Sequence, residues 1–385
     1  PAARKVEMTQ MPQLVALFNG VGGGAAALVA IVEYLNLGAE ATTAEVIFTV
    51  FTVVVGCVSF SGSIITFMKL QELMTTRPVV FPGGRFVIAG TLAAVLGTSI
   101  WVVTALGTTP LLVLAALSLL FGVLFVLPVG GADVPIVISL LNAFTGLTVA
   151  ASGYVLSSTL LIIAGTLVGA SGTILTRLMA EAMGRSLFGT LFGAFTAKPQ
   201  EAAGSAEERP VRSGSADDVA ILLNYARRVV IVPGFGLAVA QAQHTVRELA
   251  DLMISKGIDV AYGIHPVAGR MPGHMNVLLA EANVPYDQLA EMDEVNPTFG
   301  QTDVAIVIGA NDVVNPAAQT TPGCPIYGMP ILEVNHAANI IFLKRSMRPG
   351  FAGIENELLY DPKTMLLFGD AKASLTKVVS ALKAL

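Results

Sequence analysis

Hydrophobic residues follow two different patterns along this chain, one in each half. The first half contains six long apolar stretches separated by short polar segments. A helix rises about 1.5 Å per residue and the core of a bilayer is about 30 Å thick, so about 20 apolar residues are enough to span it. We therefore expect six transmembrane helices, at residues 11–35, 44–70, 86–106, 110–127, 134–156 and 160–179.

The second half alternates short apolar runs with amphipathic segments, and uninterrupted short runs are typical of buried parallel strands. We expect strands at residues 229–232, 260–262, 304–308, 331–334, 340–343 and 365–368. We expect helices at residues 238–256, 275–281, 286–292 and 371–382. This alternation predicts a doubly wound, Rossmann-like α/β domain with a parallel sheet, whose ligand binds beyond the carboxyl ends of the strands.

A polar segment separates the two patterns. Residues 185–196 form a short amphipathic stretch, and residues 198–218 are rich in Pro, Gly, Ser and charge without apolar periodicity. Such a composition is typical of a flexible linker. The predicted organisation is a transmembrane helical domain at residues 1–186, an amphipathic stretch and linker at 187–218, and a nucleotide-binding domain at 219–385.

The composition agrees with this division. Only 13% of the residues are charged, against about 25% in ordinary soluble domains, which excludes a protein that is soluble throughout. Charged residues number 15 among the first 198 residues and 34 among the remaining 187. The net charge of −5 argues against nucleic-acid binding. Cys57 and Cys324 fit neither a disulfide framework nor a metal motif.

Basic residues predict the orientation of the bundle, because loops on the cytoplasmic side concentrate Lys and Arg. They occur before the first stretch, between the second and third, and at the end of the sixth: Arg4, Lys5, Lys69, Arg77, Arg85, Arg177 and Arg185. The connections on the other side contain none. Both ends of the bundle, and the domain that follows it, are therefore expected in the cytoplasm.

Polar side chains lie inside several apolar stretches, where an unsatisfied amide costs several kcal/mol. Asn19 and Asn142 are the largest, and Ser63, Ser139 and Thr145 share their depth. Such groups either join helices or line a wet, proton-conducting track. We favour joining for the hydroxyls, while for the two asparagines both interpretations stay open.

Asp133 stands at the start of the fifth stretch, before Val-Pro. Asp at this position suits a helix N-cap, with Pro in the first turn. Its expected place facing the soluble half also leaves a coupling role open.

A glycine turn follows the first predicted strand. Gly234 suits a tight turn and Gly236 the approach of a phosphate, and the start of a long helix would offer free N–H groups, although Val239 stands where a third glycine is usual. A standard NAD site also needs an acid at the end of the second strand, and Asp259 lies at its beginning. The basic run of residues 344–346 follows another strand and suits a phosphate monoester, which favours NADP over NAD.

Three further loops are candidates for the site. Residues 263–275 and 309–318 each follow a strand, and His265 and His274 in the first are too far apart in sequence, without carboxylate neighbours, to predict a metal site. Residues 350–353 carry glycines at both ends and suit either a flap over a bound nucleotide or an ordinary surface turn.

Several strings of residues together closely resemble the β subunit of proton-translocating nicotinamide nucleotide transhydrogenase, over essentially the whole chain. They are RKVEMT at residues 4–9, GGADVP at 130–135, GIHPVAGR at 263–270, PGHMNVLLAEA at 272–282, GANDVVNPAAQ at 309–319 and FLKRSM at 342–347.

The resemblance implies an enzyme that works only with its partner. The soluble domain would bind NADP(H), reversed relative to ordinary Rossmann enzymes, and no metal. One or more α subunits would carry the NAD(H) domain and further transmembrane helices, and hydride would pass directly between the two nicotinamides. The membrane helices would couple this to inward proton movement. A multi-pass location in the bacterial inner membrane, surrounded by lipid, and a dimer of the whole complex are further expectations, as are three more helices before the first residue of this chain.

The resemblance also assigns residues. The group linking cofactor state to protonation would be Asp312, with Asn311 beside it. The cofactor would be bound by Gly234, Phe235, Gly236, Ala238, Val239, Ala240, His265, Pro266, Val267, Ala268, Gly269, Arg270, Gly309, Ala310, Asn311, Asp312, Lys344, Arg345, Ser346, Gly350, Phe351, Ala352, Gly353, Gly369, Asp370 and Ala371. The proton path would include Asn19, Ser63, Asn142 and, at its mouth, Asp133.

One departure from the family bears on the proton path. Some relatives carry a histidine where this chain has Asn19, and an amide does not titrate near neutral pH. A partner helix or bound water would then supply the titrating group. The alternative hypothesis is an ion channel or carrier whose cytoplasmic domain senses nucleotides without catalysing hydride transfer.

Overall fold

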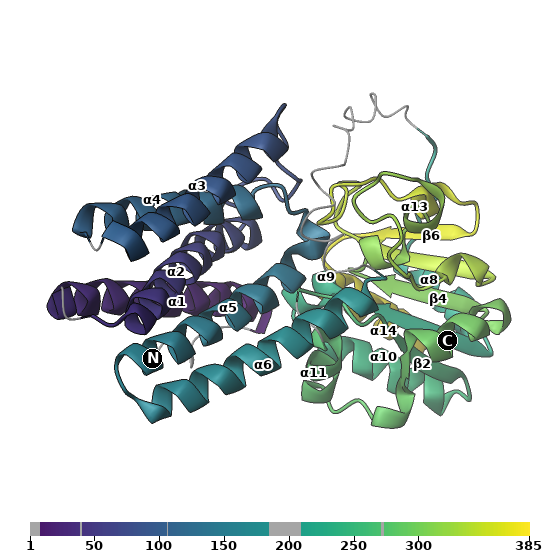
Figure 1. Cartoon of the computed structure of the whole chain (residues 1–385). Coiled ribbons are helices and arrows are strands. Elements are labelled where there is room, and N and C mark those ends of the chain that lie inside the picture. The colour runs from purple at the N-terminus through teal and green to yellow at the C-terminus, as the bar shows by residue number, and fades with distance from the viewer. Residues whose placement is uncertain (1–7, 39–40, 106, 185–208, 271–272) are drawn as a thin grey trace. The chain divides into compact units, whose positions relative to one another are not determined.

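The computed structural model describes residues 8–38, 41–105, 107–184, 209–270 and 273–385 (Figure 1). These residues fall into two compact units, one containing residues 10–181 and the other residues 209–385. The amphipathic stretch expected from residue 185, and the expected linker up to residue 208, lie outside the described residues.

The first unit is a bundle of membrane-length helices. Among the described residues, six helices are long and apolar enough to cross a bilayer, which confirms the six expected stretches. Their bounds are α1 Met11–Leu37, α2 Thr43–Leu70, α3 Gly84–Ala105, α4 Thr108–Val126, α5 Val134–Val155 and α6 Thr159–Ala182. Thr42 and Glu45 form a capping box at the start of α2, and Gly38, with φ of 55°, ends α1.

Small residues bring these helices into close contact. A Cβ atom on Gly146 of α5 would lie 2.4 Å from the backbone N of Gly169 in α6, and one on Gly165 would lie 2.3 Å from that of Ala150. The same holds between α1 and α2, where a Cβ on Gly56 would lie 2.6 Å from the carbonyl oxygen of Gly23. Backbone contact of this kind drives helix association in lipid.

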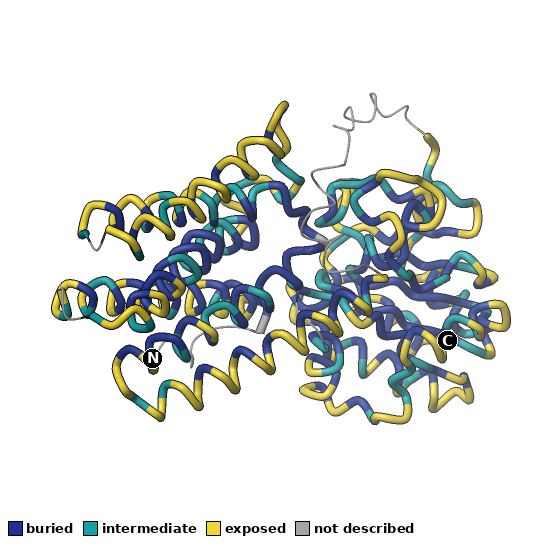
Figure 2. The backbone as a smooth tube through the Cα atoms, in the orientation of Figure 1, coloured by how far each residue is buried: buried dark blue, intermediate teal, exposed yellow. Residues whose placement is uncertain are grey.

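The outer helices of the bundle expose large apolar side chains. Phe86 of α3 is 70% exposed, and Leu160 and Leu167 of α6 are 76% and 65% exposed. Figure 2 shows α6 mostly in the colour of exposed residues, in contrast to α2. In a bilayer these faces are covered by lipid or by further helices.

The second unit is built on a parallel sheet. Its strands are β1 Arg228–Pro233, β2 Asp259–Ile264, β3 Leu289–Glu291, β4 Val304–Ile308, β5 Asn339–Lys344 and β6 Thr364–Phe368, and all pairings between them are parallel. Their order is β3-β2-β1-β4-β5-β6. This is the strand order of a doubly wound, Rossmann-like fold. The chain places successive strands on one side of β1 up to β3, and then on its other side from β4 onward, so the switch point lies between β1 and β4.

Successive strand residues face two different cores. Val229 and Ile231 of β1 join a core with the longer helices α8 Ala216–Asn224, α10 Gln243–Ser255, α11 His274–Glu281 and α14 Ala371–Ala384. Val230 and Val232 join a core with shorter segments, namely α12 Met292–Val295, η7 Asn296–Gln301, η8 Asp312–Val314, η9 Val334–His336 and η10 Glu357–Tyr360. Both faces of the sheet are covered, which explains the unbroken apolar runs.

Two of the expected elements are wrong. Residues 331–334 are not a strand, because β4 already has β1 and β5 as neighbours, and Leu332 and Val334 are instead buried against one face of the sheet. Residues 286–292 are not a helix, since Leu289–Glu291 forms the edge strand β3 after a turn of 3-10 helix at Tyr286–Gln288. The short edge strand has too few apolar residues to be recognised from its pattern.

The long helix expected at residues 238–256 is two helices. The first, α9, covers only Phe235–Val239, and α10 starts at Gln243. Between them Gln241 adopts φ of 50°, and the N–H of Ala242 donates to the carbonyl of Leu237 at 3.2 Å. A hydrogen bond between an N–H and the carbonyl five residues before it, with a left-handed residue in between, is typical of a helix C-terminus.

Ordered structure begins before the domain boundary expected at residue 219. The N–H of Leu366 in β6 donates to Arg212 O, the N–H of Gly214 donates to Leu366 O, and α8 starts at Ala216 with a capping box between Ser215 and Asp218. Residues 209–218, the described part of the expected linker, are therefore integrated into the second unit.

Candidate functional site

The glycine turns after β1 and β4 cross each other at the carboxyl end of the sheet. A Cβ on Gly234 would lie 2.4 Å from Cα of Ala310, and one on Gly236 would lie 2.6 Å from Cα of Gly309. Gly309 itself has φ of 66°. Only glycine fits this crossing, which lies at the point where the strand order reverses and where ligands of such sheets bind.

The N–H groups of the first turn differ from the expectation. Gly234 N–H donates to Ile308 O at 2.9 Å, and Gly236 N–H donates to Gly309 O at 3.0 Å. Neither group is free for a phosphate, and the helix that follows is the five-residue α9. In this structure the two glycines allow the turns to approach each other, so the long helix expected there is wrong, while a phosphate site at this turn stays a prediction.

The loop after β2 is anchored by a buried histidine. His265 is 1% exposed, its Nε2 lies 2.8 Å from Pro330 O, and its Nδ1 accepts the N–H of Val267 at 3.2 Å. An accepting Nδ1 means that the proton sits on Nε2 and is donated to Pro330 O. Burial lowers the pKa of His265 to about 4, against the raising effect of this bond, so the ring is neutral at physiological pH. His265 is the first residue of a loop that continues through Pro266, Val267, Ala268 and Gly269 to Arg270. Its hydrogen bonds to Pro330 O and to the N–H of Val267 fix the start of this loop.

Arg270 ends this loop between two aromatic rings. Its guanidinium carbon lies 4.2 Å from the ring centre of Phe235 in α9 and 4.4 Å from that of Phe351 in the expected flap. The side chain is buried, with 7% exposure. Stacking of a guanidinium on aromatic faces is favourable by about 0.5–2 kcal/mol. Arg270 thus joins the first glycine turn to the flap.

His274 contacts both Arg270 and Phe235, and it was not among the site residues expected from the sequence. Its Nδ1 accepts the N–H of Arg270 at 3.2 Å, its ring lies edge-on to Phe235, and its Nε2 has no partner among the described residues. Burial, and secondarily the charge of Arg270, lowers the pKa of His274. A Cβ on Gly269 would lie 2.5 Å from this ring, so the glycine at position 269 is the feature of the sequence that could have indicated a close contact with His274.

Asp312, Asn311 and Lys344 form a polar cluster beyond β4 and β5. Lys344 Nζ donates to Asn311 Oδ1 at 3.1 Å, and Asn311 Nδ2 donates to Asp312 Oδ1 at 3.0 Å. Burial raises the pKa of Asp312, against the lowering effects of Asn311, the N–H of Ala352 and Lys344. Burial also lowers the pKa of Lys344. The carboxyl is thus an ionisable group shifted toward neutral pH.

The expected flap lies on this cluster. The N–H of Ala352 donates to Asp312 Oδ2 at 2.9 Å, and a Cβ on Gly350 would lie 2.4 Å from Asp312 Oδ1. Gly353 closes the flap turn by donating to Gly350 O at 3.0 Å, with φ of 74°. Residues 350–353 therefore contact both the carboxylate and, through Phe351, Arg270.

The basic run extends outward from the end of β5. Lys344 is half-buried against Asn311, whereas Arg345 and Ser346 are exposed. The neighbouring turn after β6 is bonded to it, since the N–H of Gly369 donates to Lys344 O at 3.0 Å. Asp370 instead caps α14, which begins at Ala371, by accepting the N–H of Ala373 at 3.2 Å.

The polar residues expected on a proton path lie on three helices of the bundle. Asn19 of α1 is buried, and its Nδ2 donates to Ile138 O of α5 at 3.4 Å. Ser63 of α2 is fully buried, and its hydroxyl has no partner among the described residues. Asn142 of α5 is half-buried. Asp133 is buried at the N-cap position of α5, with Pro in the first turn as expected, but its side chain makes no capping hydrogen bond to that helix.

Hydroxyl groups join these helices. Ser59 Oγ and Thr145 Oγ1 lie 2.6 Å apart, Thr145 donates to Asn19 O at 3.1 Å, and Ser59 donates to Leu141 O at 3.2 Å. Ser139 of α5 donates to Gly172 O of α6 at 3.3 Å. These bonds agree with the preference for hydroxyls as joining groups, and Ser59 was not recognised from the sequence.

The prediction of orientation counted Lys69 among the loop residues between the second and third stretches, but Lys69 lies inside α2. It is fully buried in the last turn of α2, and its Nζ donates to the carbonyls of Val126, Leu127 and Val129 at 3.1, 2.7 and 2.7 Å. Its amino group satisfies carbonyls at the end of α4 that the helix itself cannot pair.

Comparison with known proteins decides the family. A family model described as NAD(P) transhydrogenase beta subunit matches residues 1–381. The chain belongs to the NAD(P) transhydrogenase β-subunit family. It is 48% identical over 389 residues to the NAD(P) transhydrogenase subunit beta of Rhodospirillum rubrum, with 99% of this chain and 84% of the relative covered, and the same values hold for the protein of a named strain of that organism.

Family membership confirms the resemblance seen in the sequence. With its six membrane-length helices, this transhydrogenase β subunit is an integral membrane protein. The family implies oxidoreductase activity together with an α subunit, and NADP(H) binding. Within the described residues, no group of three or more His, Cys, Asp or Glu side chains is placed to hold a metal ion.

Proposed function

We propose that this β subunit binds NADP(H) in its soluble unit, exchanges hydride with NAD(H) held by the partner subunit, and couples the exchange to proton translocation through its membrane helices. The observation that carries the proposal is the placement of the basic run. Lys344, Arg345 and Ser346 lie at the carboxyl end of β5, beside the crossing glycine turns of β1 and β4.

The charges at the sheet edges support NADP(H) over NAD(H). Asp259, the acid within β2, pairs with Arg228 at 2.8 Å at the amino end of the strands. An NAD site needs that acid at the carboxyl end, whereas a 2′-phosphate needs cations. Cations at β5 rather than at β2 also support a cofactor reversed relative to ordinary Rossmann enzymes.

The residues around the crossing turns fit a dinucleotide. The buried Nε2 of His274, unpartnered among the described residues, and the guanidinium of Arg270, stacked on Phe235, would supply hydrogen-bonding and cationic capacity. The His265 loop would form one wall, the turns at Gly234 and Gly309 the floor, and residues 350–353 the cover. When bound, NADP(H) supplies the hydride chemistry, while these residues bind the dinucleotide, orient it and exclude water.

Asp312 is the proposed link to the proton. Its carboxyl has a raised pKa and accepts the N–H of Ala352 in the flap. A movement of the flap removes this bond and changes the exposure of the carboxyl, which shifts its pKa. Asp312 would thereby take up or release a proton as the flap moves, with Asn311 holding it in position.

The membrane side of the proposal rests on Asn19, Ser63, Asn142 and Asp133. They are the proposed proton path, with Asp133 at its mouth. Because neither amide titrates near neutral pH, bound water or a helix of the partner would supply the titrating group. Among the described residues the hydroxyl of buried Ser63 has no partner, which supports a place for it on this path.

The proposed organisation follows from these assignments. Residues 1–186 form the transmembrane domain, 187–218 connect it to the soluble domain, and 219–385 bind NADP(H), with the preceding residues 209–218 packed onto that domain. The C-terminal domain would face the cytoplasm from the bacterial inner membrane. The complete enzyme would contain α subunits with the NAD(H) domain, as a dimer of the whole complex.

The test uses membrane vesicles that contain this chain with its α subunit. We expect NADPH-dependent reduction of an NAD analogue, at a rate that an uncoupler changes. Absence of transhydrogenation in a complete, reconstituted complex contradicts the proposal and leaves the channel or carrier with a nucleotide-sensing domain. Transhydrogenation that is insensitive to uncouplers contradicts only the proton coupling.

A narrower test addresses the 2′-phosphate. Arg345→Ala should weaken NADPH binding about tenfold or more while changing NADH binding little, since a charge-assisted contact to phosphate contributes about 1.5–3 kcal/mol. The matched control is Arg227→Ala, which removes an exposed arginine next to β1 at the amino end of the sheet. Equal losses for both nucleotides would remove the phosphate assignment.

A further inference from the structure

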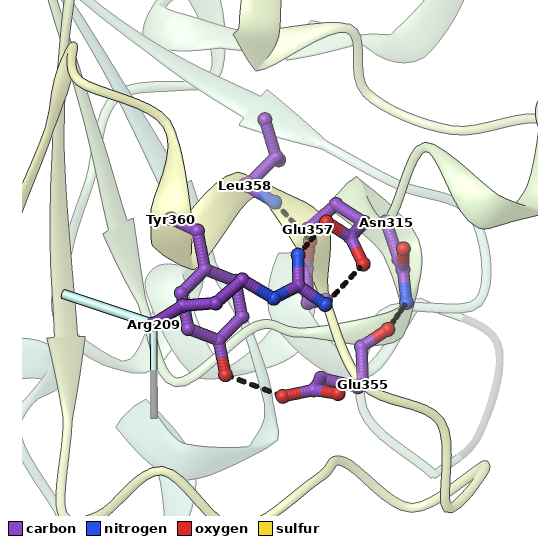
Figure 3. Close-up of polar contacts among 7 residues, drawn as sticks. Arg209, Asn315, Glu355, Glu357, Leu358 and Tyr360 are labelled. Carbon is purple, nitrogen blue, oxygen red and sulfur yellow. Dashed lines mark hydrogen bonds and ion pairs between the residues drawn. The ribbon is translucent and has the colours of Figure 1, made fainter. Parts of the chain in front are cut away.

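The chain enters the described part of the soluble unit at Arg209, and this residue is bound to the segment that follows the flap (Figure 3). Its guanidinium donates to both carboxylate oxygens of Glu357, at 2.6 and 3.2 Å. The guanidinium carbon also lies 4.6 Å from the ring centre of Tyr360. Arg209 therefore contacts η10 in two ways, by a forked ion pair and by stacking.

The same segment is tied to the loop that carries Asp312. The side chain of Asn356 is buried and donates to Asn311 O at 3.1 Å, and Asn315 Nδ2 donates to Glu355 O at 3.0 Å. Figure 3 shows Asn315 and Glu355 beside the Arg209–Glu357 pair. The Tyr360 hydroxyl donates to the Glu355 carboxylate. Residues 355–360 thus anchor the carboxyl end of the flap.

The two sides of this anchor differ in strength. Asn356 and Asn315 are buried residues, whereas the side chains of Arg209 and Glu357 are 45% and 59% exposed. Exposed ion pairs contribute about 0–1 kcal/mol, with forked arginine geometry toward the upper end. A contact of this strength forms and breaks readily, while the buried bonds hold the segment to the Asp312 loop.

We propose that Arg209 is a positioning residue for the flap: by pairing with Glu357 and Tyr360, it fixes the segment 355–360 and so keeps residues 350–353 over Asp312 and Arg270. A displacement of Arg209 loosens this anchor and shortens the time for which NADP(H) stays bound. The inference rests on the proposed NADP(H) site but assigns a role to residues that touch neither the cofactor nor Asp312. It makes the pair of Arg209 and Glu357 a determinant of cofactor retention.

The experiment is a charge exchange in the complete αβ complex. Arg209→Glu and Glu357→Arg are compared singly and together, with the dissociation rate of NADPH measured by its fluorescence after a chase with excess NADP⁺. We expect each single variant to raise the rate about two- to fivefold, in line with an exposed pair. The double variant should return the rate toward that of the wild type, which a merely structural effect of either substitution does not produce.

A second ion pair of the same domain provides the control. Lys383 and Glu248 lie 2.6 Å apart with 54% and 53% exposure, on α14 and α10. Lys383→Glu reverses one charge, as Arg209→Glu does, and should leave the NADPH dissociation rate unchanged. Thermal midpoints of all variants are recorded, and a lower midpoint with an unchanged NADPH rate counts against the proposal.

The outcomes separate the two proposals. Unchanged NADPH dissociation in both single variants, or no recovery in the double variant, overturns the role of Arg209 and leaves the proposed function intact. A wild-type complex that binds no NADPH overturns both. A reduced effect of Arg209→Glu at high salt is a further expected result, because exposed pairs are screened.

Discussion

The two units of this chain treat buried polar groups differently. In the membrane unit, Lys69, Ser59 and Asn19 donate to backbone carbonyls of neighbouring helices, of α4 for Lys69 and of α5 for the other two. In the soluble unit, Lys344, Asn311 and Asp312 bond mainly to one another and to the flap. A side chain that donates to a backbone carbonyl of a packed helix loses that hydrogen bond if it moves, which holds it in place. A cluster that is bonded to a flap can instead exchange hydrogen bonds when the flap moves.

The comparison indicates where a proton-linked change can start. Asp312 combines a raised pKa with a bond to the flap. Among the membrane residues assigned to the proton path, Asn19 is held by α5, while Ser63 has an unpartnered hydroxyl within the described residues. The soluble cluster is therefore the more suitable switch, and the bundle the more suitable rigid frame.

The largest expected effect is at Lys69. Lys69→Met removes a charged donor from three carbonyls near the end of α4. Val126 O and Leu127 O keep the N–H groups of Val129 and Val79, whereas Val129 O loses its donor among the described residues, and we expect a loss of about 4 kcal/mol in the stability of the bundle. Trp101, the one tryptophan of the chain, lies in α3 and reports unfolding of this unit by fluorescence. The control is Arg177→Met, which removes an exposed pair with Glu181. Equal stability of both variants would contradict a structural role for Lys69.

The next effect is a loss of stability of the soluble unit in acid. The pKa of His265 is about 4 when folded, against 6.5 for an unperturbed histidine. Its contribution is therefore complete above pH 6.5 and falls as the pH drops toward 4, by about 2 kcal/mol at pH 5 and about 3 kcal/mol at pH 4. Urea unfolding followed by circular dichroism at pH 7.5 and 5 measures this.

Two histidine variants isolate the source of that effect. In His265→Gln the acid-induced loss should shrink by about the same 2 kcal/mol at pH 5. In His336→Gln, which removes an exposed histidine, the wild-type pH dependence should remain. A wild-type pH dependence in both variants would rule out His265 as the cause.

A smaller effect is expected at the flap. A Cβ on Gly350 meets Asp312 Oδ1 at 2.4 Å and Asn311 Nδ2 at 2.6 Å, and both atoms are held by hydrogen bonds. Gly350→Ala should therefore displace the flap and raise the NADPH dissociation rate about tenfold, equivalent to about 1.4 kcal/mol. In Gly300→Ala the added Cβ meets nothing within 4 Å, and the rate should not change. A wild-type rate in Gly350→Ala would show that the flap does not retain NADPH.

The smallest effect concerns the hydroxyls that join helices. Thr145→Val removes the contacts with Ser59 and Asn19 and keeps the shape of the side chain, so we expect a loss of about 1 kcal/mol. The control is Thr98→Val, because Thr98 bonds only to Ala94 O within its own helix. Trp101 fluorescence again reports the unfolding, and equal midpoints for the two variants would count against Thr145 as a joining group.

The sequence predicts those parts of the fold that depend on burial of continuous apolar segments. The six membrane helices follow from their length, and five of the six sheet strands follow from short apolar runs covered on both faces. Residues 331–334 show the limit of this argument, because an apolar run that packs on a sheet face has the same pattern as a strand. The edge strand β3 has the opposite problem, since it is too short for any pattern.

The site is predictable where a residue type is required by local geometry or charge. The glycines at 234 and 236 are of this kind, because the structure requires them at the crossing turns, while the phosphate-binding role of the basic run at 344–346 stays a prediction. The stacking of Arg270 on Phe351, the burial of Lys69 and the pair of Arg209 with Glu357 join residues distant in the sequence. Such contacts depend on how the chain returns to the same place, which a single sequence does not show.

The most direct test of the central claim is a titration of the full chain with NADPH and with NADH. Binding is followed by nucleotide fluorescence in detergent, with the chain at a fixed concentration. The account predicts saturable binding of NADPH and binding of NADH that is weaker by at least about tenfold, because only NADPH has a 2′-phosphate for Lys344, Arg345 and Ser346 to bind. Equal affinity for the two nucleotides, or no binding of NADPH, would contradict it.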